Sequence, residues 1–161
     1  MQMVIYRIRK FNPETDVEAV QGINKACLPE NYPRFFFLEI YNKFGDGFNV
    51  AEVVETGELI GYEMTRIERR VSNFGFGLTK VGHIISIAVL KKYRRLGVAK
   101  KLMQAASDAL RIRDVNEVFL EVRESNQGAV DLYQKLGYQP FKVSKQYYQD
   151  GESALVMISK I

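Results

Sequence analysis

The chain has 161 residues, of which 47% are hydrophobic and 26% charged, and its 23 basic and 19 acidic residues give a net charge of +4. These values are typical of one soluble globular domain spanning residues 1–161, and charges among the first ten residues argue against a signal peptide or membrane anchor, so a cytoplasmic location is expected. The single cysteine, Cys27, excludes an internal disulfide and a cysteine-based metal site, and the spread of basic residues along the chain argues against a nucleic-acid partner.

The first half of the sequence predicts a strand, two helices and a hairpin. Asn12 is a favourable N-cap and Pro13 suits the first helical position, so a helix is expected from Pro13 to about Ala26. Pro29 and Pro33 then interrupt it, because proline restricts its own backbone and that of the preceding residue. The other elements expected here are a strand at 4–9, a helix at 34–43, and strands at 50–55 and 59–68 around a turn at 56–58.

Residues 69–80 combine Ser72, Gly75 and Gly77 with aromatic residues. This composition predicts a long, mobile hairpin tip before the next strand. Long connections of this kind are either functional loops or disordered segments, and both interpretations stay open here.

The second half alternates strands and helices. Residues 84–90 form an almost unbroken apolar run rich in β-branched residues, which is typical of an interior strand. The elements expected after it are helices at 97–113 and 126–136, the second ended by Gly137, and strands at 118–122, 139–148 and 153–159, the last two joined by a turn at 149–152. The whole order, β-α-α-β-β-β-α-β-α-β-β, predicts an α/β domain with a mixed central sheet.

A basic loop, KKYRRLGVA at 91–99, joins the interior strand to the next helix. The first N–H groups of a helix have no partner within it, and Gly97 and Ala99 leave room for an anion to approach them. Arg94 would add charge-assisted hydrogen bonds. This pattern fits a phosphate-binding loop or a basic loop that only precedes a surface helix, and it matches neither a dinucleotide fingerprint nor a Walker loop.

The pattern Arg94-x-x-Gly97-x-Ala99 after such a strand resembles the acyl-CoA pyrophosphate loop of the GCN5-related N-acetyltransferase (GNAT) family. The order of elements is similar to that family over nearly the whole chain, which implies a GNAT fold of about seven strands and four helices. Three further stretches carry the resemblance: Leu28-Pro29-Glu30-Asn31-Tyr32, Gly82-His83-Ile84 with Arg94-Arg95-Leu96-Gly97, and Tyr147-Tyr148 with Asp150-Gly151-Glu152.

Together these stretches resemble the catalytic subunits of the NatA type and their archaeal counterparts, which acetylate the α-amino group of protein N-termini. The resemblance implies acetyl-CoA (coenzyme A) as cofactor and protein N-termini as substrates, with Ser, Ala or Thr preferred and Met as a further type. It also implies the ribosome or an auxiliary subunit as a partner.

Acetyl transfer from a thioester to an amine requires a neutral amine, a polarised carbonyl and a proton for the departing thiolate. His83, the only histidine, titrates in the range needed for a base, and Glu121 interrupts an apolar strand, where a carboxylate is costly unless it is paired or functional. The structural alternatives are a hydrogen-bonded histidine at a strand start and a salt bridge from Glu121 to Arg123. The resemblance implies that both residues face the acceptor amine as a water-mediated base, with neither assigned alone.

The resemblance gives further residues a role. Tyr133 would protonate the thiolate, and Asn126 would contact the cofactor arm; without the family, Tyr133 is a core tyrosine. Glu30 would favour small first side chains. The full set of implied cofactor contacts is Ile87, Ala88, Val89, Arg94, Arg95, Leu96, Gly97, Val98, Ala99, Lys100, Asn126 and Tyr133, and the implied substrate contacts are Leu28, Pro29, Glu30, Tyr32, Arg123, Tyr147 and Tyr148.

Three other functions compete with this hypothesis. The first is acetylation of lysine side chains or of one ribosomal protein. The second is binding of acyl-CoA without catalysis, which the joint presence of His83, Glu121 and Tyr133 disfavours. The third is an anion- or RNA-binding module, whose binding would be sensitive to salt.

Overall fold

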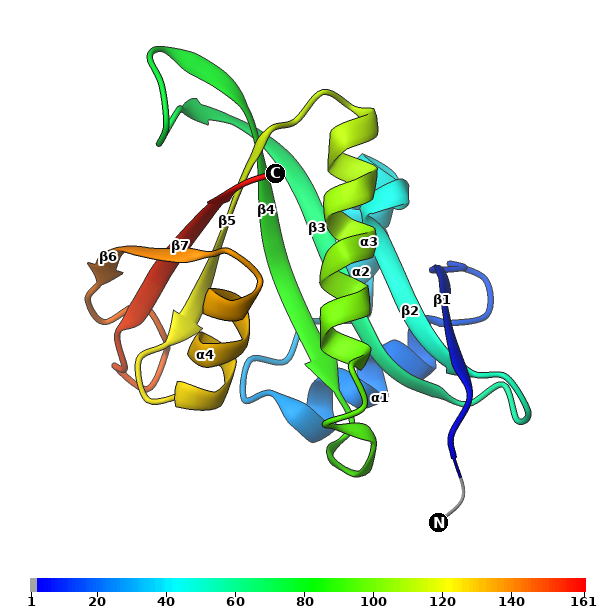
Figure 1. The fold of residues 1–161 in the computed structure, drawn as a ribbon. Helices are drawn as coiled ribbons and strands as arrows, with labels where there is room; N and C mark the ends of the chain where they lie inside the picture. Colours follow the sequence, from blue (N-terminus) through cyan, green and yellow to red (C-terminus); the bar gives the residue numbers. More distant parts are fainter. Residues whose placement is uncertain (1–2) are drawn as a thin grey trace. The chain divides into compact units, whose positions relative to one another are not determined.

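The computed structural model describes residues 3–161. Met1 and Gln2 lie outside the described residues, and they belong to the first ten residues, where no signal peptide was expected. The described residues form one seven-stranded sheet with the order β1-β2-β3-β4-β5-β7-β6 (Figure 1). The strands are β1 (Tyr6–Lys10), β2 (Phe48–Val53), β3 (Leu59–Val71), β4 (Leu78–Val89), β5 (Glu117–Arg123), β6 (Gln139–Ser144) and β7 (Ala154–Lys160). The helices are α1 (Val17–Cys27), α2 (Arg34–Phe44), α3 (Val98–Ile112) and α4 (Gln127–Lys135). The predicted α/β fold with a mixed sheet is confirmed.

The chain groups into two compact units, which are described separately. The first consists of the residues up to Arg66 together with Ile85–Ala109, and the second of Ile67–Ile84 together with Leu110–Ile161. Within residues 3–161, no helix is both long enough and apolar enough to cross a bilayer.

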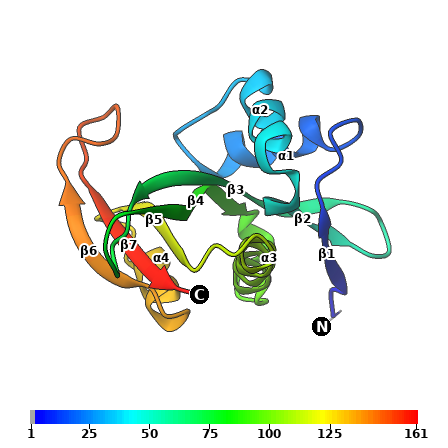
Figure 2. The same ribbon diagram turned by 90° about the horizontal axis from the view of Figure 1, so that it is seen from above.

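In the first unit, antiparallel strands β1, β2 and β3 are covered on both faces (Figure 2). Helices α1 and α2 lie on one face, where Phe37, Ile40 and Tyr62 are fully buried, and α3 lies on the other, where Leu102 is fully buried. Every residue of β2 is buried, as expected for a strand covered on both sides. The basic loop connects the end of β4 to the start of α3, and Val89, Val98 and Leu102 on either side of it belong to one buried cluster.

The predicted start of α1 at Pro13 is wrong, because the helix begins at Val17. The preceding residues form a turn in which the N–H of Asp16 donates to the carbonyl of Asn12 at 2.9 Å. The Asp16 carboxylate in turn accepts hydrogen bonds from the Asn12 N–H and from Arg9, both at 2.7 Å. Burial by itself would raise the pKa of Asp16, but these hydrogen bonds outweigh it and lower that pKa. An ion pair with the first strand therefore sets where the helix begins.

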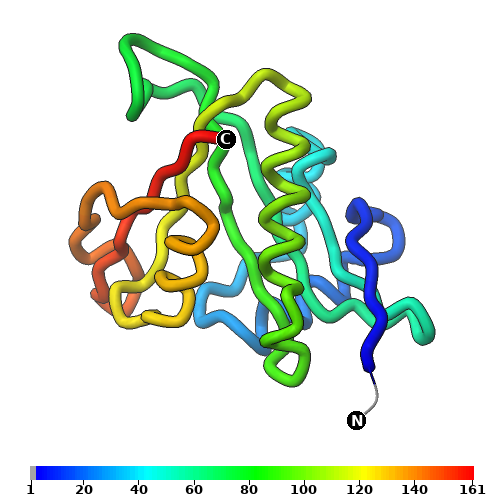
Figure 3. The backbone as a smooth tube through the Cα atoms, in the orientation of Figure 1, coloured from blue at the N-terminus to red at the C-terminus, as the bar shows by residue number. Residues whose placement is uncertain are grey.

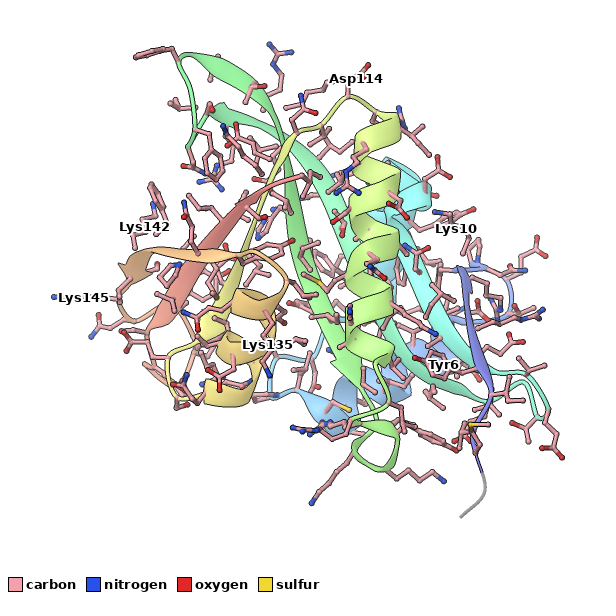
Figure 4. All side chains as sticks on the ribbon, viewed as in Figure 1. Tyr6, Lys10, Asp114, Lys135, Lys142 and Lys145 are labelled. Atoms are coloured by element: carbon pink, nitrogen blue, oxygen red, sulfur yellow. The ribbon has the colours of Figure 1, made fainter. Side chains whose placement is uncertain are left out.

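In the second unit, β5 pairs in parallel with β4 and antiparallel with β7, which also pairs with β6. Helix α4 contributes buried Val130 and Tyr133. Strand β6 is an exposed edge whose residues include Pro140 and Lys142, and Lys142 points away from the sheet (Figure 4). Proline and lysine on an edge strand hinder pairing with another chain.

Residues 69–80 were expected to be a long, mobile hairpin tip, but half of them belong to strands. Strand β3 continues to Val71 and β4 starts at Leu78, so only a short turn remains between them (Figure 3). In that turn, the N–H of Asn73 donates to Glu117 at 2.9 Å, and Phe74 packs against a buried cluster that includes Phe119. The predicted hairpin tip is therefore present, but its loop is limited to residues 72–77, because strand pairing and these anchors organise the rest of the segment.

The last predicted hairpin is shorter than expected. Strand β6 ends at Ser144, so Tyr147 and Tyr148 lie in the connection to β7 rather than on a paired strand. The backbone of Gln146 is left-handed, with φ of 53°, and this turns the chain out of the strand before the tyrosines. The two tyrosine rings contact each other edge to face, with centroids 4.9 Å apart.

Gly82 of β4 lies against Leu110, which is fully buried in the second unit. A Cβ atom at Gly82 would lie 2.5 Å from Cδ1 of Leu110, closer than atoms can pack. We expect Gly82→Ala to lower the free energy of unfolding by about 1–3 kcal/mol through overpacking, measured by urea denaturation. The matched control is Gly22→Ala in α1, where no atom lies within 4 Å and where alanine should stabilise the helix. Equal unfolding midpoints for the two variants would contradict this.

Candidate active site

His83 lies between two carboxylates in the second unit. Its Nδ1 is 2.6 Å from Oε2 of Glu68 on β3, and its Nε2 is 2.7 Å from Oε2 of Glu121 on β5. The three side chains are only 10%, 20% and 15% exposed for His83, Glu68 and Glu121. The structure therefore brings the predicted pair His83 and Glu121 together, and it adds Glu68, which sequence reasoning missed.

The imidazole of His83 is also fixed by an aromatic contact. The Phe119 ring stacks on it, with centroids 4.1 Å apart and planes 19° apart. The guanidinium of Arg70 lies 4.4 Å from the centroid of the same Phe119 ring and 3.6 Å from Oε1 of Glu68. The histidine is therefore held by hydrogen bonds at both nitrogens and by stacking on its face, as a residue with a fixed orientation requires.

Arg123 pairs with residues of the β6–β7 connection instead of forming the alternative salt bridge with Glu121. Its Nη1 is 2.8 Å from Asp150 and 2.8 Å from Glu152, and its guanidinium lies 4.1 Å from the centroid of the Tyr148 ring. Hydrogen bonds from Ser125 and then from Arg123 lower the pKa of Glu152 to about 2. Arg123 therefore stabilises the loop that carries Tyr148, and Glu121 pairs with His83.

Helix α4 carries the other two predicted residues of the second unit. Asn126 is its N-cap, and its Oδ1 accepts the N–H of Ala129 at 3.2 Å. Tyr133 is 7% exposed, and burial raises its pKa to about 12. Its phenol therefore keeps its proton at neutral pH and remains a hydrogen-bond and proton donor.

The basic loop of the first unit leads directly into helix α3. Helix α3 begins at Val98, directly after Gly97, which has φ of 79°, and Arg95 is also left-handed, with φ of 68°. A Cβ atom at Gly97 would meet only the Tyr6 hydroxyl, at 3.7 Å. The space beside Gly97 is therefore free of bulk, which is compatible with the anion site predicted at the first N–H groups of the helix.

Two side chains hold this loop in place. The Tyr6 hydroxyl on β1 (labelled in Figure 4) donates to the carbonyl of Leu96 at 2.9 Å, and Nε of Arg94 donates to the carbonyl of Val89 at 2.9 Å. Arg94, predicted to bind phosphate, thus also ties the loop to the end of β4. Tyr6 was missed, because it is a tyrosine in an alternating strand and nothing in the local sequence links it to residue 96.

Asn24 organises the connection between α1 and α2, which carries the predicted substrate contacts. It is fully buried; its Nδ2 donates to the carbonyl of Glu30 at 3.0 Å, and its Oδ1 accepts the N–H of Tyr32 at 3.1 Å. The same Nδ2 donates to the Tyr62 hydroxyl at 3.1 Å, which lies 2.7 Å from Oγ of Ser86 on β4. One buried network therefore joins the loop backbone to β4, and sequence reasoning had missed all three members: Asn24, Tyr62 and Ser86.

The sequence-predicted site residues fall into two groups. In the first unit lie the loop residues Leu28, Pro29, Glu30 and Tyr32, the end of β4 at Ile87, Ala88 and Val89, and the basic-loop residues Arg94, Arg95, Leu96, Gly97, Val98, Ala99 and Lys100. In the second lie His83, Glu121, Arg123, Asn126, Tyr133, Tyr147 and Tyr148. Among the described residues, the register of β4 with β5 covers Gly82 to Ile84, so the last residues of β4 extend beyond the paired segment.

Residues 17–138, about three quarters of the chain, match the sequence pattern of the "Acetyltransferase (GNAT) family". The chain belongs to the GNAT acetyltransferase family. The resemblance stated from the basic loop and the order of elements is thereby confirmed, together with the GNAT fold.

Curated relatives of this GNAT acetyltransferase cover most of its length. It is 46% identical to an N-alpha-acetyltransferase of Sulfurisphaera tokodaii, over 97% of the chain and 93% of the relative. It is 38% identical to the N-terminal acetyltransferase A complex catalytic subunit NAA10 of Arabidopsis thaliana, over 88% of the chain and 71% of the relative. Among solved structures, Ard1 from Thermoplasma volcanium superimposes with a TM-score of 0.85 at 28% identity, covering 97% of both chains.

GNAT acetyltransferases use acetyl-CoA. The glycine at 97 leaves the start of α3 open, while Arg95 and Lys100 add positive charge beside it. When bound, acetyl-CoA supplies an acetyl group activated as a thioester. The residues present in this chain are thus compatible with the cofactor that the family uses.

Proposed function

We propose that this acetyltransferase transfers the acetyl group of acetyl-CoA to the α-amino group of protein N-termini. The observation that carries the proposal is the contact of 2.7 Å between His83 and Glu121, which forms a buried acid–base pair. His83 belongs to the segment of β4 that pairs with β5, the strand of Glu121. The name of the Sulfurisphaera tokodaii relative, N-alpha-acetyltransferase, supports the same acceptor.

The acid–base pair has a task suited to this acceptor. An α-amino group has a pKa of about 8, so part of it is already neutral near pH 7 and a base of modest strength suffices to remove the remaining proton. In the proposed mechanism, the proton passes from the α-ammonium group through water to the pair of His83 and Glu121. The nitrogen keeps its electron pair for the attack.

Other residues of the chain would hold and polarise the reactants. The N–H groups of residues 87–89 would donate to the thioester carbonyl, and the start of α3 would bind the pyrophosphate. The phenol of Tyr133, whose pKa is raised to about 12 by burial, would donate its proton to the departing sulfur. Asn126, besides capping α4, would contact the cofactor arm.

We also propose that residues 1–161 act as one catalytic domain. Glu30 and Tyr32, on the loop that Asn24 anchors, would hold the first residues of the substrate, and Glu30 would favour Ser, Ala or Thr at the first position. Tyr147 and Tyr148 would contribute from the β6–β7 connection, where Arg123 fixes Tyr148.

We further propose that the enzyme works in the cytoplasm with an auxiliary subunit, or at the ribosome. This rests on the Arabidopsis relative, whose name describes it as the catalytic subunit of a complex. Copurification with a partner protein, or cosedimentation with ribosomes at physiological salt, tests the proposal.

A peptide panel tests the proposed reaction. Peptides that differ only in their first residue, Ser, Ala, Met or Glu, are incubated with acetyl-CoA, alongside a peptide with a blocked N-terminus and an internal lysine. Transfer to free Ser and Ala termini, with weaker transfer to the Met terminus, is expected. Transfer only to the internal lysine would replace the proposed acceptor with a lysine side chain, and cofactor binding without any transfer would indicate a binding protein.

A further inference from the structure

Tyr6 of β1 has no role in the mechanism above, yet its hydroxyl crosses 90 positions of sequence to donate to the carbonyl of Leu96 at 2.9 Å. We propose that Tyr6 is a positioning residue for acetyl-CoA, because it fixes the peptide plane between Leu96 and Gly97 at the start of α3. This inference rests on the proposed function, in which the start of α3 binds the pyrophosphate.

The backbone around Leu96 needs such an anchor. Leu96 lies between two residues with a left-handed backbone, Arg95 with φ of 68° and Gly97 with φ of 79°. Glycine adopts this conformation readily, but for arginine it costs free energy, so Arg95 keeps it only where the surrounding contacts hold the chain. The hydrogen bond from Tyr6 acts on the residue between the two and therefore stabilises this course of the backbone.

The direction of the Leu96 carbonyl also sets the direction of the next N–H group. The C=O and N–H bonds of a trans peptide point in opposite directions. The Leu96 carbonyl is directed at Tyr6, so the N–H of Gly97 points away from β1. A flip of this peptide would put a carbonyl oxygen where that N–H now lies, and an oxygen repels an anion. Tyr6 therefore opposes the flip and keeps the N–H of Gly97 as a donor for the pyrophosphate.

The ring of Tyr6 is itself held in place. It packs against the buried cluster that includes Val98 and Leu102 of α3, and Nζ of Lys101 lies 4.9 Å from its centroid. An ammonium group is attracted to the face of an aromatic ring, so the ring also keeps the charge of Lys101 near the start of α3. One side chain thus orders both a peptide group and a positive charge at the proposed pyrophosphate site.

Tyr93 provides a matched control in the same unit. Its ring packs against the same buried cluster as that of Tyr6, and Nζ of Lys92 lies 5.0 Å from its centroid. Its hydroxyl, however, donates at 2.8 Å to Oε2 of Glu58 in the β2–β3 turn and not to the backbone of the basic loop. Tyr93 also precedes residues 94–100, which include the implied contacts of the basic loop with the cofactor. The two tyrosines therefore differ in what their hydroxyls hold.

Calorimetric titration with CoA tests the inference. Tyr6→Phe removes only the hydroxyl and should weaken CoA binding by about three- to tenfold, which is the net effect of one hydrogen bond. Tyr93→Phe should bind CoA as tightly as the wild type. Unchanged affinity in Tyr6→Phe, or an equal loss in both variants, would overturn the inference.

A donor without a pyrophosphate adds a readout that a merely structural role would not move. With a peptide that starts with Ser, Tyr6→Phe should lower kcat/KM for acetyl-CoA by about three- to tenfold. It should leave kcat/KM unchanged for acetyl-pantetheine, which lacks the nucleotide and the pyrophosphate. Equal losses with the two donors would show that Tyr6 supports the fold in general, and they would refute its positioning role.

Different results would refute the proposed function. The titration needs no acceptor, so a wild type that binds CoA but acetylates no N-terminus would refute the proposed acceptor alone. Gly97→Glu changes the basic loop itself, and unchanged CoA affinity in that variant would refute the pyrophosphate site together with the role of Tyr6. If Gly97→Glu loses CoA binding and Tyr6→Phe does not, the role of Tyr6 alone is refuted.

Discussion

Replacing Glu121 with glutamine is expected to lower kcat by about 100-fold to 1000-fold, because the variant loses a carboxylate of the proposed acid–base pair. Glutamine has the same shape, and its amide oxygen still accepts the hydrogen bond from Nε2 of His83, so the orientation of the histidine should survive. The basic loop is untouched, so the KM for acetyl-CoA should stay within about twofold of the wild type.

Steady-state kinetics with a peptide that starts with Ser measure this change. Glu117→Gln is the matched control. Glu117 is a buried carboxylate on the same strand as Glu121, and it accepts the N–H of Asn73 instead of contacting His83. An unchanged kcat for Glu121→Gln would show that Glu121 only pairs with His83. A KM for acetyl-CoA that rises in proportion to the loss of kcat would instead point to a disturbed fold of the cofactor site.

Replacing Gly97 with glutamate is expected to weaken acetyl-CoA binding by about 100-fold, or about 3 kcal/mol. The side chain would place bulk and negative charge at the start of α3, where we propose that the helix N-terminus binds the pyrophosphate. Calorimetric titration with acetyl-CoA measures the dissociation constant directly.

Strain alone would also weaken the loop, so this test needs a control with the same strain. Gly97 has φ of 79°. Gly77, in the turn before β4, has φ of 76°, and a Cβ atom added there would have no other atom within 4 Å. Gly77→Glu therefore has a comparable backbone cost, about 1–2 kcal/mol. It adds the same charge before the first residue of β4, whereas the basic loop follows the last residue of that strand. Equal loss of cofactor affinity in both variants would refute the assignment of the loop.

Local signals in the sequence predicted most of the fold. Helix α2 (Arg34–Phe44) starts where predicted, because Pro33 restricts the backbone just before it. Helix α1 was placed too early, since the turn before it depends on the ion pair of Asp16 with Arg9, which only the folded first strand provides. The start of β4 at Leu78 was missed for a similar reason: its first residues carry no continuous apolar pattern, and strand pairing alone defines them.

The candidate site shows the same division between local and distant signals. His83 and Glu121 were recognisable as a rare histidine and a carboxylate inside an apolar strand. Glu68 was not, because it lies 15 residues from His83 at the end of a strand with several other charges, and only the pairing of β3 with β4 makes it a neighbour. Asn24 was equally hidden, since a buried asparagine in a helix is recognised by its partners and not by its spacing.

The Asn24 network has a practical consequence for redesign of the enzyme. Asn24 holds Glu30 and Tyr32 through main-chain atoms, the carbonyl of one and the N–H of the other. A different side chain at position 30 would leave this anchor in place, so acceptor preference could be altered there while the loop backbone keeps its course. Since we propose that Glu30 selects the first residue of the substrate, position 30 is the place to start a directed-evolution library for new N-terminal residues, with Asn24 kept constant throughout.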